Sequence, residues 1–197
     1  MQLSPGTWPQ VGLLGAVALV GGLLDWRLGM LLAVPVPLVI WFHRDPDRAP
    51  PAAGVIAPAD GRISVVDRTD GHTRIGTFMN VTDVHVNRAP VTGTVTAVTH
   101  RPGANRPAFS KDSARNERVE IDIETHRGVV QVVLIAGWFA RRIHPYVTEG
   151  QRVQRGERIG HISYGSRADV VLADGAEPAV QEGTRVRAGE SVLIERS

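Results

Sequence analysis

The chain has 197 residues and a formal net charge of +2. This length suits one compact domain with an appendage, and the charge is too small to indicate a nucleic-acid partner. The absence of cysteine excludes disulfides, thiol nucleophiles and cysteine-ligated metal sites. Frequent glycine and proline favour short strands and many turns over helices.

Two apolar runs, Val11–Leu24 and Leu28–Phe42, occupy the N-terminal part of the chain. Tryptophans stand at their ends, as they do at membrane interfaces. We predict a membrane-associated apolar hairpin over residues 1–43, either re-entrant or made of two spanning helices; the alternative is a buried helical hairpin of a soluble domain. Arg44 and Arg48 follow the second run, and no basic side chain precedes the first. The positive-inside rule then places the rest of the chain on the cytoplasmic side of the cell membrane.

Residues 44–53 form a charged, proline-rich linker, because residues that precede proline resist helix formation. From residue 54 to residue 197 the sequence indicates one domain made almost entirely of strands. The segment Pro58-Ala59-Asp60-Gly61 has the composition of a turn between the first two strands. Strands are expected at 55–57, 62–66, 73–81, 84–88, 92–99, 118–123 and 129–136.

The C-terminal part contains an internal repeat. Val147–Glu157 and Val180–Glu190 share the pattern V-x-E-G-x-x-V-x-x-G-E, with seven of eleven positions identical. The glycines suit tight turns and the valines suit a core. This pattern is similar to the small flattened barrels of biotinyl and lipoyl carrier domains. We therefore predict a mainly β fold, a flattened β-barrel or sandwich with carrier-like hairpin repeats, preceded by the apolar helical hairpin.

Gly165 and Ser166 lie between two apolar segments and between the two copies of the repeat. A Gly-Ser pair at such a junction is usually an ordinary turn, because glycine tolerates positive φ and serine bonds to its own backbone. The pair also permits chemistry. A serine hydroxyl can attack the preceding carbonyl when the turn is strained, a base lies nearby and donors receive the developing charge. Ser166 is therefore a candidate nucleophile.

Four stretches stand in order along the chain: Pro58-Ala59-Asp60-Gly61, Asp83-Val84-His85-Val86-Asn87-Arg88-Ala89-Pro90, Phe109-Ser110-Lys111-Asp112-Ser113 through Asn116-Glu117-Arg118, and Gly165-Ser166. This combination resembles the phosphatidylserine decarboxylase family, and most closely its short branch, which includes the archaeal archaetidylserine decarboxylases. The resemblance covers roughly residues 44 to 174. Each stretch is a weak signal alone, whereas the four in order behind an apolar hairpin are specific.

The resemblance implies a self-cleaving proenzyme. The Ser166 oxygen would attack the Gly165 carbonyl to give an ester, and elimination and hydrolysis would release ammonia and leave a pyruvoyl group heading residues 166–197. That group would form a Schiff base with the amine of a serine phospholipid and accept electrons as carbon dioxide leaves, which yields an ethanolamine phospholipid. The fragments 1–165 and 166–197 are expected to stay associated, and the family is compatible with a homodimer.

Further site residues follow from the resemblance. His85 matches the motif histidine, and the ordinary pKa of histidine suits proton transfer at neutral pH. Asp60 matches the acidic residue of the turn motif and is expected to orient the histidine. Longer family members carry a second histidine where this chain has Arg88, which leaves open whether His85 serves cleavage, decarboxylation or both. Asn116 and Lys111 are candidates for contacting the phosphate or serine headgroup.

No metal is expected, because Asp83 and His85 have no evident third ligand. Two other classes of protein remain open. A biotinyl- or lipoyl-type carrier needs a modifiable lysine at a hairpin tip, but Lys111, the one lysine, lies outside both repeat copies. A membrane-anchored β-barrel scaffold without catalysis explains the hairpin and the repeat but gives no role to Ser166. The lipid tails, fatty-acyl esters or isoprenoid ethers, are also left open.

Overall fold

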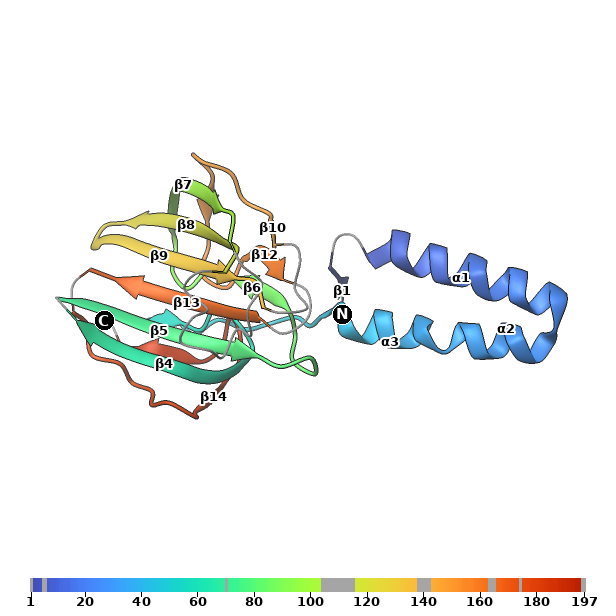
Figure 1. Ribbon diagram of the computed structural model, residues 1–197. Coiled ribbons are helices and arrows are strands. Elements are labelled where there is room, and N and C mark those ends of the chain that lie inside the picture. Colours follow the sequence, from blue (N-terminus) through green and yellow to red (C-terminus); the bar gives the residue numbers. More distant parts are fainter. Residues whose placement is uncertain are drawn as a thin grey trace. The chain divides into compact units, whose positions relative to one another are not determined.

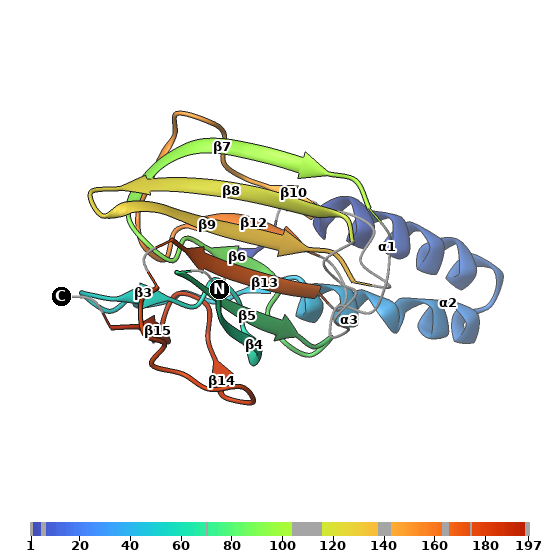
Figure 2. The same cartoon turned by 60° about the vertical axis from the view of Figure 1, so that its left-hand side comes forward.

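The computed structural model describes residues 2–4, 7–69, 71–103, 116–137, 143–162, 166–173 and 175–195. The chain forms two compact units, Met1–Asp47 and Arg48–Ser197 (Figure 1, Figure 2). The boundary between them lies inside the linker predicted over residues 44–53. The first unit is mostly helical and the second is built of strands.

The first unit is a helical hairpin, made of α1 (Thr7–Leu24), α2 (Trp26–Ala33) and α3 (Pro35–Phe42) and closed at its base by β1 (Gln2–Leu3) paired with β2 (Arg44–Asp45). Asp25 caps α2 by accepting hydrogen bonds from the backbone amides of Arg27 and Leu28. Gly22 and Gly29 meet where α1 and α2 pack, since a Cβ on Gly29 would lie 2.6 Å from the Gly22 Cα. The predicted apolar helical hairpin is therefore confirmed, and glycines allow its close packing.

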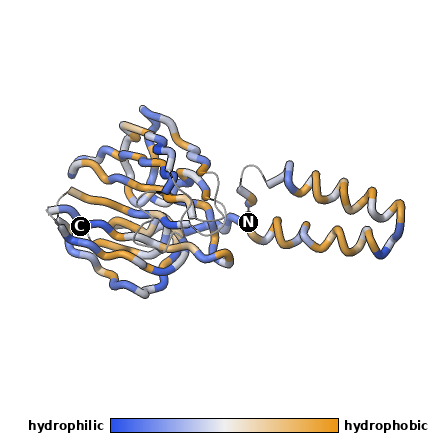
Figure 3. Tube along the Cα trace, viewed as in Figure 1, coloured by the Kyte–Doolittle hydropathy of each residue, from blue (hydrophilic) through white to orange (hydrophobic). Residues whose placement is uncertain are grey.

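The hairpin is apolar along most of its length (Figure 3). Among the helices in the described ranges, α1 alone is long and apolar enough to cross a membrane, with 18 residues. Large apolar side chains are exposed on all three helices, including Leu13, Leu23, Leu31, Leu38 and Trp41. Exposed apolar surface of this extent marks a contact with a membrane or with another protein.

The second unit is dominated by a curled eight-stranded antiparallel sheet (Figure 1, Figure 2). Its strands, in spatial order, are β11 (Arg152–Val153), β7 (Gly93–Arg101), β8 (Arg118–Thr125), β9 (Gly128–Ile135), β13 (Ser166–Leu172), β5 (His72–Met79), β4 (Gly61–Thr69) and β14 (Arg185–Val186). Two smaller sheets consist of β10 (Ile143–Pro145), β12 (Arg158–Ile162) and β6 (Val86–Arg88), and of β15 (Val192–Ile194) with β3 (Val55–Ile56). The predicted mainly β fold is confirmed, and most predicted strands are observed close to their expected bounds.

The eight-stranded sheet has an internal pseudo-two-fold relation centred between β9 and β13. The order β11-β7-β8-β9 on one side matches β14-β4-β5-β13 on the other. The backbone hydrogen bonds repeat as well, since the amide of Ile56 bonds to the Pro90 carbonyl and the amide of Arg88 bonds to the Pro58 carbonyl. Both β4 and β7 also carry a register irregularity near their starts. Residues of the paired strands in one half therefore have counterparts in the other.

The two copies of the sequence repeat take equivalent places in this arrangement. The amide of Gly150 bonds to the Val95 carbonyl of β7, and the amide of Gly183 bonds to the Ile63 carbonyl of β4. Both glycines have positive φ, 83° and 87°, a conformation that side chains with a Cβ rarely adopt. The predicted carrier-like repeat is confirmed. A second, weaker repeat, A-P-x-x-G at 57–61 and 89–93, was not recognised from the sequence.

Candidate active site

Ser166 is the first residue of β13, which lies between β9 and β5 in the eight-stranded sheet. It pairs with Met79, the last residue of β5, and the next residue, Arg167, pairs with Ile135 of β9. Its side chain is fully buried, with Oγ 3.9 Å from the Met79 sulfur. The predicted nucleophile therefore starts an inner strand in a setting without bulk water. Gly165, the other half of the predicted cleavage site, lies outside the described residues.

His85 lies just before β6 and is buried. Its Nδ1 lies 2.9 Å from the carbonyl oxygen of Asp83. Because a carbonyl oxygen only accepts hydrogen bonds, Nδ1 carries the proton, and Nε2 is the atom of the neutral ring that can take one. The backbone carbonyl of His85 accepts a hydrogen bond from the amide of Ile162, the last residue of β12. His85 therefore adjoins the strand that leads into the Gly165-Ser166 segment.

Asp60 lies in the turn before β4, where two groups hold its carboxylate. Arg48 donates to both oxygens, at 3.0 and 2.8 Å, and the Ala188 amide donates to Oδ1 at 2.7 Å. Burial raises the pKa of the Asp60 carboxyl; Arg48 and the amide oppose that rise, and nearby Asp83 adds to it. That Asp60 orients His85 stays a prediction. Asp60 bonds to Arg48 and Ala188, and the Asp83 carbonyl holds the His85 ring.

Thr92 takes the position of Asp60 in the other half of the domain. Its Oγ1 accepts a hydrogen bond from the amide of Arg155 at 3.0 Å, as Asp60 accepts one from Ala188. Both side chains tie a turn of the sequence repeat to the turn before a sheet strand, so part of the role of Asp60 is structural. The carboxylate adds a negative charge that a threonine lacks.

A backbone hydrogen bond joins the turn that contains Asp60 to the segment that contains His85. The amide of Arg88, at the end of β6, donates to the carbonyl of Pro58 at 2.9 Å. Pro58 and Asp60 belong to the same turn, and Arg88 and His85 to the same short segment. The two predicted catalytic residues therefore lie on adjacent backbone segments.

The turn of Asp60 also packs against the strand that pairs with Ser166. A Cβ on Gly61 would lie 2.0 Å from the Phe78 carbonyl oxygen, so the chain can pass there only with glycine. Phe78 precedes Met79, the register partner of Ser166. Ser166, His85 and Asp60 thus converge on one region of the domain, although they come from three distant parts of the sequence.

The remaining predicted residues have other surroundings. Asn116 is fully buried, and its Nδ2 donates to the carbonyl of Ala136 at 2.8 Å, which ties the segment before β8 to the end of β9. Its contact with a lipid headgroup stays a prediction. Lys111 lies outside the described residues. Arg88 is buried and donates to the Gly156 carbonyl at 2.9 Å, so it anchors a turn of the repeat.

An aromatic cluster near the site was not predicted from the sequence. The ring of His161 stacks on that of His144 with centroids 4.6 Å apart, and the Tyr146 hydroxyl lies 2.6 Å from His161 Nδ1. His161 directly precedes Ile162, whose amide bonds to His85. A sequence signal existed, because His161 lies in the apolar stretch that runs into Gly165 and Ser166.

An ion-pair network on β13 was also not predicted. The Asp169 side chain is fully buried and is bonded by Arg167 Nε at 2.8 Å and by Arg74 Nε at 2.7 Å. Side chains alternate along a strand, so Arg167 and Asp169 lie on the face opposite to Ser166. Gly76 of β5 leaves the room for this network, since a Cβ there would lie 2.7 Å from Asp169 Oδ1. The network joins the middle of β13 to β5.

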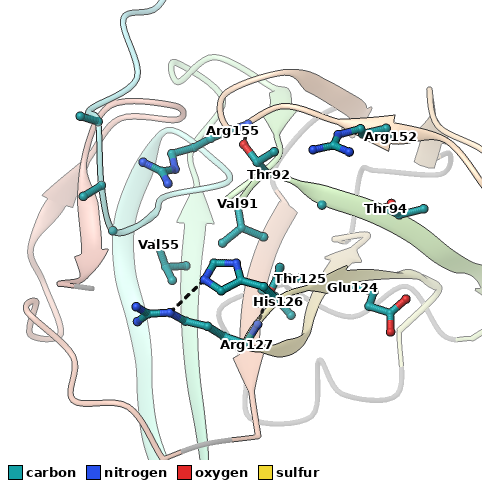
Figure 4. A pocket seen from close by; sticks show the side chains of 15 residues that line it. Val55, Val91, Thr92, Thr94, Glu124, Thr125, His126, Arg127, Arg152 and Arg155 are labelled. Carbon is teal, nitrogen blue, oxygen red and sulfur yellow. Dashed lines mark hydrogen bonds between the residues drawn. The ribbon is translucent and has the colours of Figure 1, made fainter. Parts of the chain in front are cut away.

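A pocket of about 580 Å³ lies near the turn between β8 and β9 (Figure 4). It is lined by 52–55, 91–94, 124–127, Val130, Arg152 and Arg155. Ser166 lies beside the other end of β9, and eight strand residues span ~25 Å. The pocket is therefore separate from the candidate active site. Under the pseudo-two-fold relation it is the counterpart of that site, with Thr92 in the position of Asp60.

Comparison with known proteins agrees with the motifs. The sequence model of the phosphatidylserine decarboxylase family matches residues 37–194. A protein of Halobacterium salinarum, provisionally named an archaetidylserine decarboxylase proenzyme, is 53% identical over 196 residues, which cover 96% of each chain. The phosphatidylserine decarboxylase proenzyme of Thermobifida fusca is 53% identical over 172 residues, which cover 85% of this chain and 79% of the relative.

A second provisionally named archaetidylserine decarboxylase proenzyme, from Methanococcoides burtonii, is 42% identical over 185 residues, which cover 93% of this chain and 87% of the relative. Relatives of this similarity and coverage share a fold over nearly the whole chain, and two of the three carry names of the archaeal-type branch. The resemblance that the four motifs indicate is thereby confirmed. The chain belongs to the phosphatidylserine decarboxylase family, and it is a decarboxylase.

Proposed function

We propose that the chain is a proenzyme that cleaves itself between Gly165 and Ser166 and then decarboxylates a serine phospholipid at the membrane. The products are carbon dioxide and the corresponding ethanolamine phospholipid. One observation carries the proposal: Ser166 is fully buried at the start of an inner strand, and the backbone next to it leads to His85 and to the turn of Asp60. A non-catalytic scaffold gives no role to this arrangement.

The proposed self-cleavage begins when the Ser166 hydroxyl gives its proton to a base and its oxygen bonds to the Gly165 carbonyl carbon. The carbonyl then re-forms as the bond to the Ser166 nitrogen breaks and that nitrogen takes a proton, which leaves an ester. Removal of the Cα proton of residue 166 expels the Gly165 carboxylate, and water then releases the nitrogen as ammonia. His85 suits these proton transfers, because the Asp83 carbonyl fixes the tautomer in which Nε2 accepts.

The site fits the pyruvoyl group that this reaction would make. That group supplies an electron sink for the loss of a carboxylate from a bound amino acid. Such chemistry needs a setting from which water is excluded, and the full burial of Ser166 against Met79 provides one. His85, buried in the same region, is the candidate to return a proton to the substrate carbon after carbon dioxide has left.

The strand pairing supports continued association of the two fragments. Residues 166–197 contribute β13, β14 and β15, and β13 pairs with β5 along its whole length and with β9 from Arg167 to Leu172. β14 and β15 add pairs to β4 and β3. A cut before Ser166 therefore leaves both chains hydrogen-bonded within one sheet.

The apolar hairpin supports a membrane location. Eighteen residues of α1 span about 27 Å, close to the ~30 Å of the bilayer hydrocarbon core. Arg44 lies 4.2 Å from the centre of the Trp41 ring and donates to the Trp41 carbonyl, which suits a pair at the membrane interface. A phospholipid substrate stays in the bilayer, so an anchored enzyme meets it by lateral diffusion. The basic residues after the hairpin favour the cytoplasmic side for the catalytic domain.

Intact mass spectrometry of the purified full-length protein tests the proposal, with Ser166→Ala as the matched control. We expect the wild type to give one chain ending at Gly165 and a second chain from residue 166 without a normal amino terminus. The variant should give one chain of 21.3 kDa. In vesicles that contain a serine phospholipid labelled in its carboxyl group, only the wild type should release labelled carbon dioxide. A folded, membrane-bound wild type that remains one unmodified chain would contradict the proposal and favour the scaffold.

A further inference from the structure

Two buried polar side chains near Ser166 have an atom that bonds to no protein group in the part of the chain that the structure describes. They are Thr77 on β5, through its Oγ1, and Asn87 on β6, through its Oδ1. Both residues are fully buried. A buried polar atom without a partner destabilises a folded protein, because it has lost its bonds to water and gained nothing in return.

Both side chains lie in the region of the core around Met79, the register partner of Ser166. Asn87 Nδ2 is 3.7 Å from the Met79 sulfur, and Ser166 Oγ is 3.9 Å from the same sulfur. A thioether is a weak acceptor, so these contacts use little of the hydrogen-bonding capacity of either group. Thr77 precedes Met79 by two residues on the same face of β5, and it pairs with Ala168, two residues beyond Ser166. Asn87 and Ser166 therefore contact the same methionine, and Thr77 lies two residues before it on the same face of β5.

The fold does not require polar residues at these two positions. In the other half of the pseudo-two-fold arrangement, Ile123 takes the place of Thr77 and Val55 takes the place of Asn87, according to the equivalent strand pairings and backbone hydrogen bonds. Both counterparts are apolar and buried. The same backbone thus packs apolar side chains in one half and unpaired polar side chains in the half that holds Ser166.

Another buried threonine of β5, Thr73, does have a hydrogen-bond partner for its hydroxyl. It lies on the same face as Thr77, is fully buried, and donates from Oγ1 to the Ala176 carbonyl at 2.7 Å. Its register partner on β13 is Leu172, at the end of the strand opposite to Ser166. The unpaired hydroxyl is therefore peculiar to the end of β5 where the Ser166 chemistry is proposed.

We propose that Asn87 and Thr77 hydrogen-bond the oxygen that becomes negatively charged when Ser166 attacks the Gly165 carbonyl. The inference rests on the proposed function and adds two residues to its machinery. The Thr77 hydroxyl and the Asn87 amide are donors, and the amide can turn about its last torsion to exchange nitrogen and oxygen. Gly165 is covalently bonded to Ser166, so this oxygen forms within a few bonds of the serine. Donors in a dry site stabilise such charge more strongly than water does.

The test compares the rate of self-cleavage with stability for isosteric apolar variants. The full chain would be synthesised cell-free with lipid nanodiscs, and cleavage would be followed in time by intact mass. We expect Thr77→Val and Asn87→Leu to cleave at least tenfold more slowly than wild type. In a Ser166→Ala background, which keeps the chain intact, their urea unfolding midpoints should equal or exceed that of the parent, because an unpaired polar atom is removed. The control Thr73→Val should cleave at the wild-type rate and unfold at a lower midpoint.

A further variant separates the hydroxyl from general packing effects. Thr77→Ser keeps the hydroxyl and should cleave within about twofold of wild type, well above Thr77→Val. Wild-type cleavage rates in Thr77→Val and Asn87→Leu would overturn the inference, and so would Thr77→Ser cleaving as slowly as Thr77→Val. An uncleaved wild type would instead overturn the proposed function, so the two failures are distinguishable.

Discussion

His85 and Asp60 are each held by identified hydrogen-bond partners. A backbone carbonyl, that of Asp83, sets the tautomer of His85, while Asp60 is held by Arg48 and by the Ala188 amide. The backbone therefore sets which nitrogen of His85 can accept a proton. The contribution that we expect from Asp60 is the position of its turn and its negative charge.

The pH dependence of stability should report the charge state of Asp60. Burial raises the pKa of this carboxyl above its ordinary value of 3.8, so between the two values the folded chain holds the proton and the unfolded chain does not. The free energy of unfolding should then fall as the pH rises through this window. Asp60→Asn cannot titrate, so in a Ser166→Ala background the wild-type side chain should lose stability relative to Asp60→Asn over the same pH range. Urea unfolding at several pH values measures the difference.

The matching control is the exposed Glu177, whose pair with Arg68 is open to solvent at 87% and 53% side-chain exposure. Glu177→Gln should leave the pH dependence nearly unchanged, because such a pair contributes little to stability. A wild type that instead gains stability over Asp60→Asn as the pH rises would mean that Arg48 outweighs burial and holds the pKa of Asp60 below its ordinary value.

At the scale of elements, β13 is buried on both faces, and the two faces carry different kinds of side chain. One face carries Ser166 and Ala168 into the core, and the other carries Arg167 and Asp169. Asp169 bonds to Arg74 of the neighbouring strand as well. An inner strand held in this way would keep its first residue in place after the proposed cleavage before Ser166.

Loss of the Asp169 carboxylate should therefore be costly. Asp169→Ala leaves the buried Arg167 and the half-buried Arg74 without their anion. Removing one partner of a buried ion pair typically costs ~3–5 kcal/mol. We expect a loss of that order in the free energy of unfolding, measured by urea in a Ser166→Ala background. Glu177→Ala, at the exposed pair with Arg68, should cost less than ~1 kcal/mol. Equal losses for the two variants would show that the network on β13 contributes no more than a surface pair.

The elements that sequence reasoning found are those whose signals are local. Gly150 and Gly183 mark the repeat because a turn with positive φ must carry glycine wherever it occurs. Ser166 and His85 were predicted from short sequence motifs, which are local signals as well. Sequence reasoning could not predict the interactions of Asp169 and Thr77 or the pairing of Arg48 with Asp60. These interactions depend on which strands pair and in what register. Strand register is set by tertiary packing over the whole sheet.

At the scale of the whole molecule, one half of a duplicated architecture carries the candidate active site. The candidate active site and the pocket near Thr92 are counterparts, and the second lacks both the carboxylate of Asp60 and the serine of β13 (Figure 4). In the half that holds the pocket, β8 and β9 are joined by a short turn, whereas their counterparts β5 and β13 in the other half are far apart in sequence. Fold duplication thus supplies a frame that both halves share, and the connection that leads into β13 contains the proposed cleavage site.

Because the chain forms two compact units, we expect the strand-built unit alone to determine self-cleavage and the apolar hairpin to affect the turnover of lipid in a bilayer. Ser166, His85 and Asp60 all lie in the unit Arg48–Ser197, so deletion of residues 1–43 should leave self-cleavage within about twofold of wild type. Decarboxylation of a serine phospholipid in vesicles should fall at least tenfold, because the substrate stays in the bilayer and the enzyme loses its anchor, whereas a soluble short-chain substrate should be turned over as before.

An unrelated membrane-spanning helix fused in place of residues 1–43 provides the matched control for this deletion. It should restore most of the activity on vesicles if the apolar hairpin acts as an anchor, because confinement to the bilayer then suffices. Carbon dioxide release and intact mass, measured on the same preparations, distinguish lipid access from self-processing. Equal activity on vesicles with and without the hairpin would show that the catalytic unit reaches its lipid unaided, and failure of the deleted chain to cleave would show that the hairpin takes part in forming the site.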